Sequence, residues 1–412
     1  MNNYPWNVNT NNGSRFARDG RAKLINAKLQ AVQGLLGRTL RLTACASEPF
    51  PFRDFGGKRF NDSPYYGEGC FCMEMIVEEP LFEQICSWNN IVLAYKNARK
   101  CKRYRKSCLS FEHNREEYLF LLQEEMKNLT YKVGKYKHFK VYEPKERDIS
   151  ALPFRDRIMQ HAVYNVLNPI FDKTFMYDSY ACRKNKGTLK AVDRISYFMN
   201  KEDCQWFLYC DVRKYFKSVN PLVLKKILER KVKEPSVLHL LYEVIDSSEE
   251  SGIPIGNLLS QMFANIYLND LDFYICHTIK PSEKDRYMDD FLLFFRTKHE
   301  AWEAKDKIEP FLSDYLCINL NDKTYVGKTR RGLTFCGYKI KSNDKEIKQA
   351  TIDRMERKEK AWENGKMTDS SFLDSISSAV GHCKGTSSYN KVCDVLVRAL
   401  RHSIGTKQTF TP

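Results

Sequence analysis

The sequence predicts an α+β fold. Apolar runs at residues 207–210 and 291–295 have the length and composition of buried strands. Longer amphipathic or apolar segments, such as residues 258–274, predict helices between these strands. The last part, residues 352–401, is basic and predicts helices without strands. A small sheet packed with helices and followed by a helical end belongs to the α+β class.

The first 79 residues differ in composition from the rest. Six of the first 13 residues are Asn, and Pro and Gly are frequent between residues 49 and 69. One helix is expected at 22–36. We expect residues 1–79 to form an N-terminal leader that is poorly ordered or accessory.

From residue 80 onward the sequence predicts a globular part. Amphipathic helices are expected at 81–100 and 111–128, with a basic segment between them. Alternating aromatics and lysines at 131–142 favour a pair of strands, and a buried helix is expected at 158–167. The elements expected after these are a strand at 207–210, helices at 221–231 and 258–274, a hairpin at Asp289, a helix at 302–315, short strands at 318–320 and 334–340, and helices over 352–401 with breaks near Gly365 and Gly385.

The charge balance favours a polyanionic partner. The net charge is +16, with 67 Lys and Arg against 51 Asp and Glu, and the basic residues are spread along the chain. This suits a long nucleic acid better than a small acidic ligand, although an ordinary basic protein is an alternative. The 14 cysteines include no CxxC pair, and no apolar run reaches the length of a membrane span. We therefore expect a cytoplasmic protein with no membrane contact.

Two groups of aspartates predict a metal site. Asp289 and Asp290 lie between a polar run, 282–286, and an apolar run, which favours a tight hairpin turn that presents carboxylates. Asp211 ends another predicted strand. If the two strands are neighbours, these carboxylates can share two Mg²⁺ or Mn²⁺ ions, with the carbonyl of Val212 as a further ligand. A solvated turn and a helix cap are the alternatives for the two groups.

These residues carry a resemblance to reverse transcriptases. The runs 207–220 (FLYCDVRKYFKSVN), 252–270 (GIPIGNLLSQMFANIYLND) and 287–290 (YMDD) resemble motifs A, B and C of that family. In the family's order, further blocks that resemble it lie at 145–157, 177–188, 321–324 and 335–338. The resemblance implies an RNA-directed DNA polymerase with a right-hand fold. Fingers and a palm with an antiparallel sheet would span 80–345, and a helical thumb would span 346–412.

The resemblance also implies roles for single residues in catalysis. Asp211, Asp289 and Asp290 match the metal-binding aspartates. Phe216 matches the steric gate that favours dNTPs over ribonucleotides, with a core aromatic as the alternative. Lys323 matches a lysine that donates a proton to the leaving pyrophosphate, with an exposed surface lysine as the alternative.

Further implied contacts concern the nucleotide and the primer. Lys145 and Arg147 would reach the incoming triphosphate. Other dNTP contacts are implied for Tyr215, Ile255, Gly256, Ser260 and Gln261, and a primer grip for Phe335, Gly337 and Tyr338. His382 is expected to be structural.

Motif B narrows the resemblance to one subfamily. Ile255-Gly256 and Ser260-Gln261 resemble the reverse transcriptases of diversity-generating retroelements, where many relatives carry Gln-Gly and Ser-Pro. Those enzymes copy a template-repeat RNA into cDNA with errors at adenines, and they work with a small basic helical-bundle accessory protein. Ile255 in place of Gln removes a polar arm near the templating base, which we expect to loosen base selection. A neutral packing change is the alternative.

Two other functions stay open. One is a retron, defence-associated or group II-like reverse transcriptase without targeted mutagenesis. The other is a nucleic-acid binder without catalysis, against which the intact Asp211, Asp289 and Asp290 argue.

Overall fold

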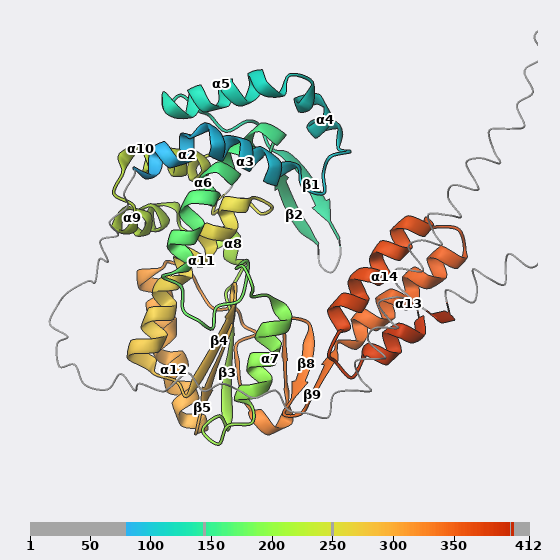
Figure 1. The fold of residues 1–412 in the computed structure, drawn as a ribbon. Helices are drawn as coiled ribbons and strands as arrows, with labels where there is room; N and C mark the ends of the chain where they lie inside the picture. Colours follow the sequence, from blue (N-terminus) through green and yellow to red (C-terminus); the bar gives the residue numbers. More distant parts are fainter. Residues whose placement is uncertain (1–79, 143–145, 249–250, 396, 399–412) are drawn as a thin grey trace, which may run out of the picture. The chain divides into compact units, whose positions relative to one another are not determined.

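The computed structural model describes residues 80–142, 146–248, 251–395 and 397–398 (Figure 1). All of these residues belong to one compact unit, Cys72–Pro412. The expected leader at 1–79, with its helix, and Lys145 lie outside the described residues.

A group of helices begins the described chain. It consists of α2 (Leu81–Cys86), α3 (Trp88–Arg99), α4 (Lys106–His113), α5 (Arg115–Lys127) and α6 (Phe154–Asp172). The helix expected at 81–100 is interrupted at Ser87, which has extended backbone and whose side chain accepts a hydrogen bond from the Asn90 N–H. The helix expected at 111–128 is likewise divided, at Asn114. Helix α3 packs along α6 (Figure 1).

A two-stranded hairpin extends from these helices. Strand β1 (Lys137–Val141) pairs antiparallel with β2 (Arg147–Ala151). The expectation of a strand pair within 131–142 was therefore wrong, because the second strand follows residue 146. Residues before β1 are instead held against α6, where the buried Tyr131 hydroxyl donates a hydrogen bond to Asp156 at 2.7 Å.

The central sheet has four antiparallel strands in the order β4-β5-β3-β6; Figure 1 labels the first three of them. Their bounds are β3 Trp206–Asp211, β4 Glu283–Tyr287, β5 Asp290–Phe295 and β6 Tyr325–Lys328. Every side chain from Phe291 to Phe295 is buried, as its apolar run predicts. Helix α12 (Lys298–Pro310) packs against β3, β5 and β6, and α7 (Thr188–Phe198) packs against β4.

Helices between these strands follow local sequence signals closely. They are α8 (Tyr215–Ser218), α9 (Pro221–Lys231), α10 (Pro235–Asp246) and α11 (Leu258–Tyr274). Helix α9 begins at Pro221 because the Asn220 side chain accepts hydrogen bonds from the first free N–H groups, and proline needs none. The bounds of α9 and α11 are the predicted ones. Helix α12 begins earlier than expected, since Thr297 and Glu300 form a capping box, and it continues into a π-helical turn, Phe311–Tyr315.

A second sheet connects to the last helices. It contains β7 (Leu333–Phe335), β8 (Tyr338–Lys341) and β9 (Asp344–Ile347), and it is followed by α13 (Gln349–Glu363) and α14 (Asp369–Cys383). The single strand expected at 334–340 is a hairpin, because Cys336 and Gly337 take positive φ values of 49° and 89°, as a two-residue turn requires. The strand expected at 318–320 is only an isolated bridge between Val212 and Leu320.

This arrangement confirms the α+β class and agrees with the right-hand polymerase fold. A helical layer with a hairpin precedes the antiparallel central sheet. Helices α13 and α14 and the helical residues 389–395 follow it, with the expected breaks near Gly365 and Gly385. Among the described helices, none combines the length and the apolar character that crossing a membrane requires.

Candidate active site

The predicted carboxylates meet at one end of the central sheet. Strands β3 and β5 pair antiparallel with Asp211 directly opposite Asp290. Strands β4 and β5 form a hairpin in which Tyr287 pairs with Asp290, so that only Met288 and Asp289 make the turn. The sheet therefore brings together the end of the first predicted strand and the YMDD turn, as the sequence predicted.

Two polar residues orient these carboxylates, and sequence reasoning missed the part that both play. The Tyr209 hydroxyl donates a hydrogen bond of 2.6 Å to Asp290 Oδ1. The Asn321 side chain donates to Asp211 Oδ2 at 3.0 Å, and its backbone N–H donates to the Asp211 carbonyl at 2.7 Å. Tyr209 lies two residues before Asp211 on the same strand, hence on the same face of the sheet, which is the signal that could have identified it.

The local electrostatics penalise negative charge in the turn. Burial, together with the neighbouring carboxylates of Asp290 and Asp211, raises the pKa of Asp289 from 3.8 to about 6, while Arg147 acts in the opposite direction. Arg147 begins strand β2, so the β1–β2 hairpin contributes positive charge to this site.

The donor set fits a hard divalent cation. Carboxylate oxygens and a main-chain carbonyl at Val212 are ligands of the kind that Mg²⁺ and Mn²⁺ prefer. Within the described residues, no three carboxylate, imidazole or thiolate groups converge closely enough to form a ready-made metal cluster. Asp211 and Asp290 are instead held by Asn321 and Tyr209, respectively.

The loop before α11 forms hydrogen bonds both with strand β2 and with Phe216, the predicted steric gate. The Ile253 N–H donates to the Phe216 carbonyl at 2.8 Å, and the Ser150 N–H of β2 donates to the Ile255 carbonyl at 3.0 Å. Gly252 has a φ of +87°, and a Cβ there would lie 2.2 Å from the Phe216 carbonyl oxygen. Only glycine satisfies both the conformation and the approach. Phe216 itself is partly buried against the core.

The residues of the predicted nucleotide pocket differ in exposure. Ile255 lines a small pocket with Tyr136 and His138, and Gly256, which is exposed, has a φ of +108°. The Tyr215 side chain is buried and its hydroxyl donates to the Ala264 carbonyl at 2.6 Å, so a nucleotide contact at this position falls to the backbone. Ser260 is fully buried and Gln261 half-buried. Their predicted contacts with a dNTP stay predictions.

The remaining predicted residues lie at two places. Lys323 is exposed and lies two residues after Asn321, whose side chain contacts Asp211. Phe335 and Tyr338 are buried, and the Tyr338 hydroxyl donates to the His382 carbonyl at 2.6 Å, so His382 has a structural contact as expected. Gly337 forms the turn between them, with its φ of +89°. The predicted proton transfer and primer grip stay predictions.

A third residue missed from sequence is Arg286. Sequence reasoning placed it in a polar run before the hairpin, but the structure puts it in β4 with a side chain only 2% exposed. Asp272, the buried one of two acidic residues on the mainly apolar helix α11, is its partner at 2.6 Å. A buried acidic residue on an apolar helix requires a cation, and this requirement is the signal that could have predicted the pair.

Comparisons with known proteins agree with this geometry. A family model described as reverse transcriptase (RNA-dependent DNA polymerase) matches residues 137–340. Protein YkfC of Escherichia coli is 24% identical over 252 residues, which cover 49% of this chain and 66% of YkfC. The putative COX1/OXI3 intron 2 protein of Saccharomyces cerevisiae is 22% identical over 261 residues, which cover 47% of this chain and 30% of that protein.

Other similar proteins include an intron-encoded protein and a solved structure. The group II intron-encoded protein LtrA of Lactococcus lactis is 26% identical over 140 residues, which cover 32% of this chain and 23% of LtrA. The match thus spans less than two thirds of each of these relatives. Apo telomerase from Candida tropicalis superposes with a TM-score of 0.43 at 13% identity, covering 67% of this chain and 59% of that one.

Proposed function

Because the chain carries a reverse transcriptase domain over residues 137–340, we propose that it is an RNA-directed DNA polymerase that acts in the cytoplasm. The observation that carries the proposal is the position of Asp211 directly opposite Asp290 at the end of the central sheet, with Asp289 in the adjoining turn. This is the constellation that two-metal nucleotidyl transfer needs.

Two Mg²⁺ ions, or Mn²⁺ in their place, would bind at Asp211, Asp289, Asp290 and the Val212 carbonyl, and would supply charge stabilisation to the triphosphate and the attacking primer hydroxyl. The raised pKa of Asp289 supports this assignment, since a bound cation would offset both causes of the rise, first its burial and then the neighbouring carboxylates of Asp290 and Asp211. Tyr209 and Asn321 orient the carboxylates of Asp290 and Asp211, respectively, by hydrogen bonds.

Other side chains would bind the substrates. Arg147, and Lys145 beside it in sequence, would contact the triphosphate, and Phe216 would exclude a ribose 2′-hydroxyl. Lys323 would donate a proton to the leaving pyrophosphate. Helices α13 and α14 would hold the template–primer duplex through contacts with its phosphates, to which the basic residues of α13 would contribute.

The substitution of Asp289 and Asp290 by Ala tests the polymerase assignment. We expect dNTP incorporation on a primed RNA template to be abolished, while RNA binding stays near the wild-type level. Continued synthesis by this variant would refute the assignment. Replacement of Phe216 by Ala should increase incorporation of ribonucleotides relative to dNTPs, because the ring no longer crowds the 2′-hydroxyl.

More narrowly, we propose that the chain copies a template-repeat RNA into adenine-mutagenised cDNA that diversifies a target gene. The support is the motif B sequence, with Ile255-Gly256 and Ser260-Gln261. A small basic helical-bundle protein would be its partner. The alternative, a group II-like enzyme without targeted mutagenesis, is favoured by the intron-encoded relatives.

Sequencing of cDNA distinguishes the two possibilities. A mutagenic enzyme should misincorporate chiefly opposite template adenines, whereas uniform errors would reject this part of the proposal. An Ile255→Gln variant should lower the error rate if the missing polar arm loosens base selection. A near-repeat pair in the neighbouring DNA that differs only at adenines would support the mutagenic function independently.

A further inference from the structure

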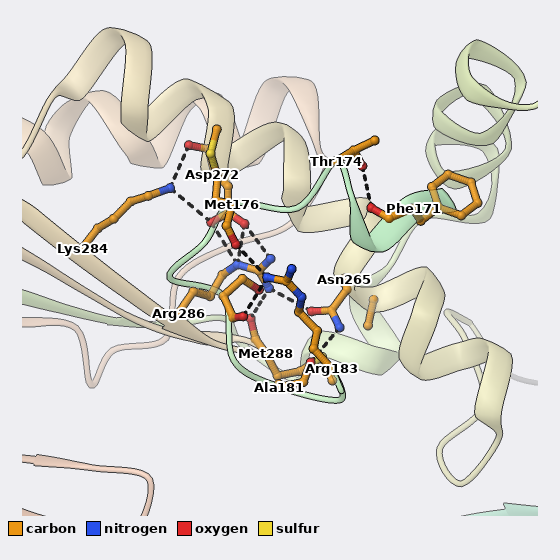
Figure 2. Close-up of polar contacts among 12 residues, drawn as sticks. Phe171, Thr174, Met176, Ala181, Arg183, Asn265, Asp272, Lys284, Arg286 and Met288 are labelled. Carbon is orange, nitrogen blue, oxygen red and sulfur yellow. Dashed lines mark hydrogen bonds and ion pairs between the residues drawn. The ribbon is translucent and has the colours of Figure 1, made fainter. Parts of the chain in front are cut away.

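The Arg286 guanidinium joins the predicted catalytic turn to the helix that follows motif B. Its Nε donates to both carboxylate oxygens of Asp272, at 3.0 and 2.9 Å, and its Nη2 donates to Asp272 Oδ2 at 2.6 Å. Its Nη1 donates to Asn265 Oδ1 at 3.3 Å and to the Met288 carbonyl at 3.0 Å. Figure 2 shows these contacts converging on one side chain between β4 and α11.

This network is buried and internally paired. The side chains of Arg286 and Asp272 are 2% and 3% exposed, so neither charge is satisfied by water. A buried charge is tolerated only when it is paired and hydrogen-bonded. The planar guanidinium of arginine can donate from two nitrogens to one carboxylate at the same time. Lys284, on the same strand, lies 4.0 Å from the Asp272 carboxylate and donates a hydrogen bond to the Asp272 carbonyl at 3.3 Å.

The contact with Met288 concerns a strained residue. Met288 has a φ of +60°, a conformation that non-glycine residues adopt rarely and at a cost in free energy. Such a conformation persists where the surrounding structure holds it. The Met288 carbonyl belongs to the peptide that leads into Asp289, so the guanidinium fixes the plane from which the Asp289 side chain departs.

The backbone of Arg286 is anchored as well. Its N–H donates to the Asp178 carbonyl and its carbonyl accepts from the Tyr180 N–H, both at 2.9 Å. Asn265 donates to the Ala181 carbonyl at 3.0 Å, and Arg183 binds the Met176 and Ser179 carbonyls at 2.7 and 2.9 Å. Three separate segments of the chain, β4, α11 and residues 176–183, therefore fix the position of this one arginine.

We propose that Arg286 is a positioning residue that sets the metal affinity of the YMDD turn through its hydrogen bond to the Met288 carbonyl. This inference rests on the proposed function, because it assumes that Asp289 and Asp290 bind divalent cations. A merely structural ion pair would stabilise the fold and leave the metal affinity of the folded protein unchanged.

The Arg286→Lys variant tests this proposal. Lysine keeps a positive charge beside Asp272, but it lacks the fork that reaches Asp272 and Met288 together. We expect Mn²⁺ binding to the folded protein, titrated by electron paramagnetic resonance without nucleic acid, to weaken on the order of 10-fold, as for other residues that orient metal ligands. The half-activating Mg²⁺ concentration should rise by a similar factor.

Lys284→Met is the matched control, since it removes a second cation near Asp272 but keeps the Arg286 side chain that donates to the Met288 carbonyl. We expect its Mn²⁺ affinity to equal that of the wild type. If Arg286→Lys folds, as judged by thermal unfolding, and binds Mn²⁺ as well as the control does, the proposal is overturned.

A second variant serves if Arg286→Lys does not fold. Asp272→Glu keeps the buried charges paired but lengthens the acidic arm by one methylene, which displaces the guanidinium from Met288. We again expect weaker Mn²⁺ binding, and an unchanged affinity in the folded variant overturns the proposal. Because Mn²⁺ binding needs no polymerisation, a wild-type protein that binds Mn²⁺ yet synthesises no cDNA would refute the proposed function alone.

Discussion

Replacement of Asp289 by Asn should stabilise the metal-free protein while abolishing polymerisation. The Asp289 carboxyl has its pKa raised from 3.8 to about 6, first by burial and then by Asp290 and Asp211. At about 1.4 kcal/mol for each pKa unit, the rise corresponds to about 3 kcal/mol of folding free energy lost when the group ionises. This figure is an upper bound, since the side chain is only partly buried.

The sign of this effect follows from proton binding. Between about pH 4 and about pH 6, the folded state holds a proton on Asp289 that the unfolded state has released. The free energy of unfolding therefore falls as the pH rises through this window. Above this pH window, the full free-energy cost of the ionised Asp289 is present. The Asn variant carries no ionisable group there, and its advantage should be largest at pH 8 and absent below about pH 4.

Urea unfolding in the presence of EDTA, at pH 4 and pH 8, measures the difference. Asp306→Asn, which changes an exposed carboxylate on α12, controls for general charge effects and should show no such pH dependence. Added Mg²⁺ should narrow the gap at pH 8 by stabilising the wild type alone. A variant that is no more stable than the wild type at pH 8, or whose gain is the same at both pH values, would refute the reasoning.

Three further substitutions test single contacts. Tyr209→Phe removes the hydrogen bond to Asp290 Oδ1 and should raise the half-activating Mg²⁺ concentration on the order of 10-fold; an unchanged Mg²⁺ requirement in the folded variant would show that the hydroxyl does not orient the carboxylate. Gly252→Ala places a Cβ 2.2 Å from the Phe216 carbonyl oxygen at a φ of +87° and should cost about 2 kcal/mol or more in urea unfolding; a neutral effect would contradict the close approach. Tyr338→Phe leaves the His382 carbonyl without its 2.6 Å donor and should cost about 1–3 kcal/mol, and an unchanged midpoint would show that the hydroxyl is dispensable.

The elements best predicted from sequence are those with complete local signals. Helix α9 has a side-chain cap at Asn220 and a proline at its first position, and strand β5 is an uninterrupted apolar run. Such signals depend on residues close in sequence, so they can be recognised without the tertiary structure. The meeting of Asp211 with Asp290 was also predictable, because each ends or begins a recognisable strand.

Elements that depend on distant partners were predicted poorly. Strand β1 pairs with β2 across residues that the alternation at 131–142 did not include. Strand β4 is polar in sequence, yet Asp285 and Arg286 are buried in it. Its position is stabilised by α11 and by residues 178–180, which sequence periodicity cannot detect. The contacts of Tyr209 and Asn321 with the carboxylates were missed because their partners lie 81 and 110 residues away in sequence, although the shared face of Tyr209 and Asp211 was a signal for Tyr209.

In the loop before α11, the main chain and the side chain of residue 255 have separate contacts. At Ile255 the main-chain carbonyl accepts the hydrogen bond from Ser150, while the side chain lines a pocket beside Tyr136. Any amino acid has this main-chain carbonyl, so a substitution at residue 255 preserves the hydrogen bond from Ser150 of strand β2. Natural selection can therefore vary the side chain there at little structural cost, so under the proposed role of Ile255 an accurate copying enzyme and an error-prone one would be one substitution apart on the same scaffold.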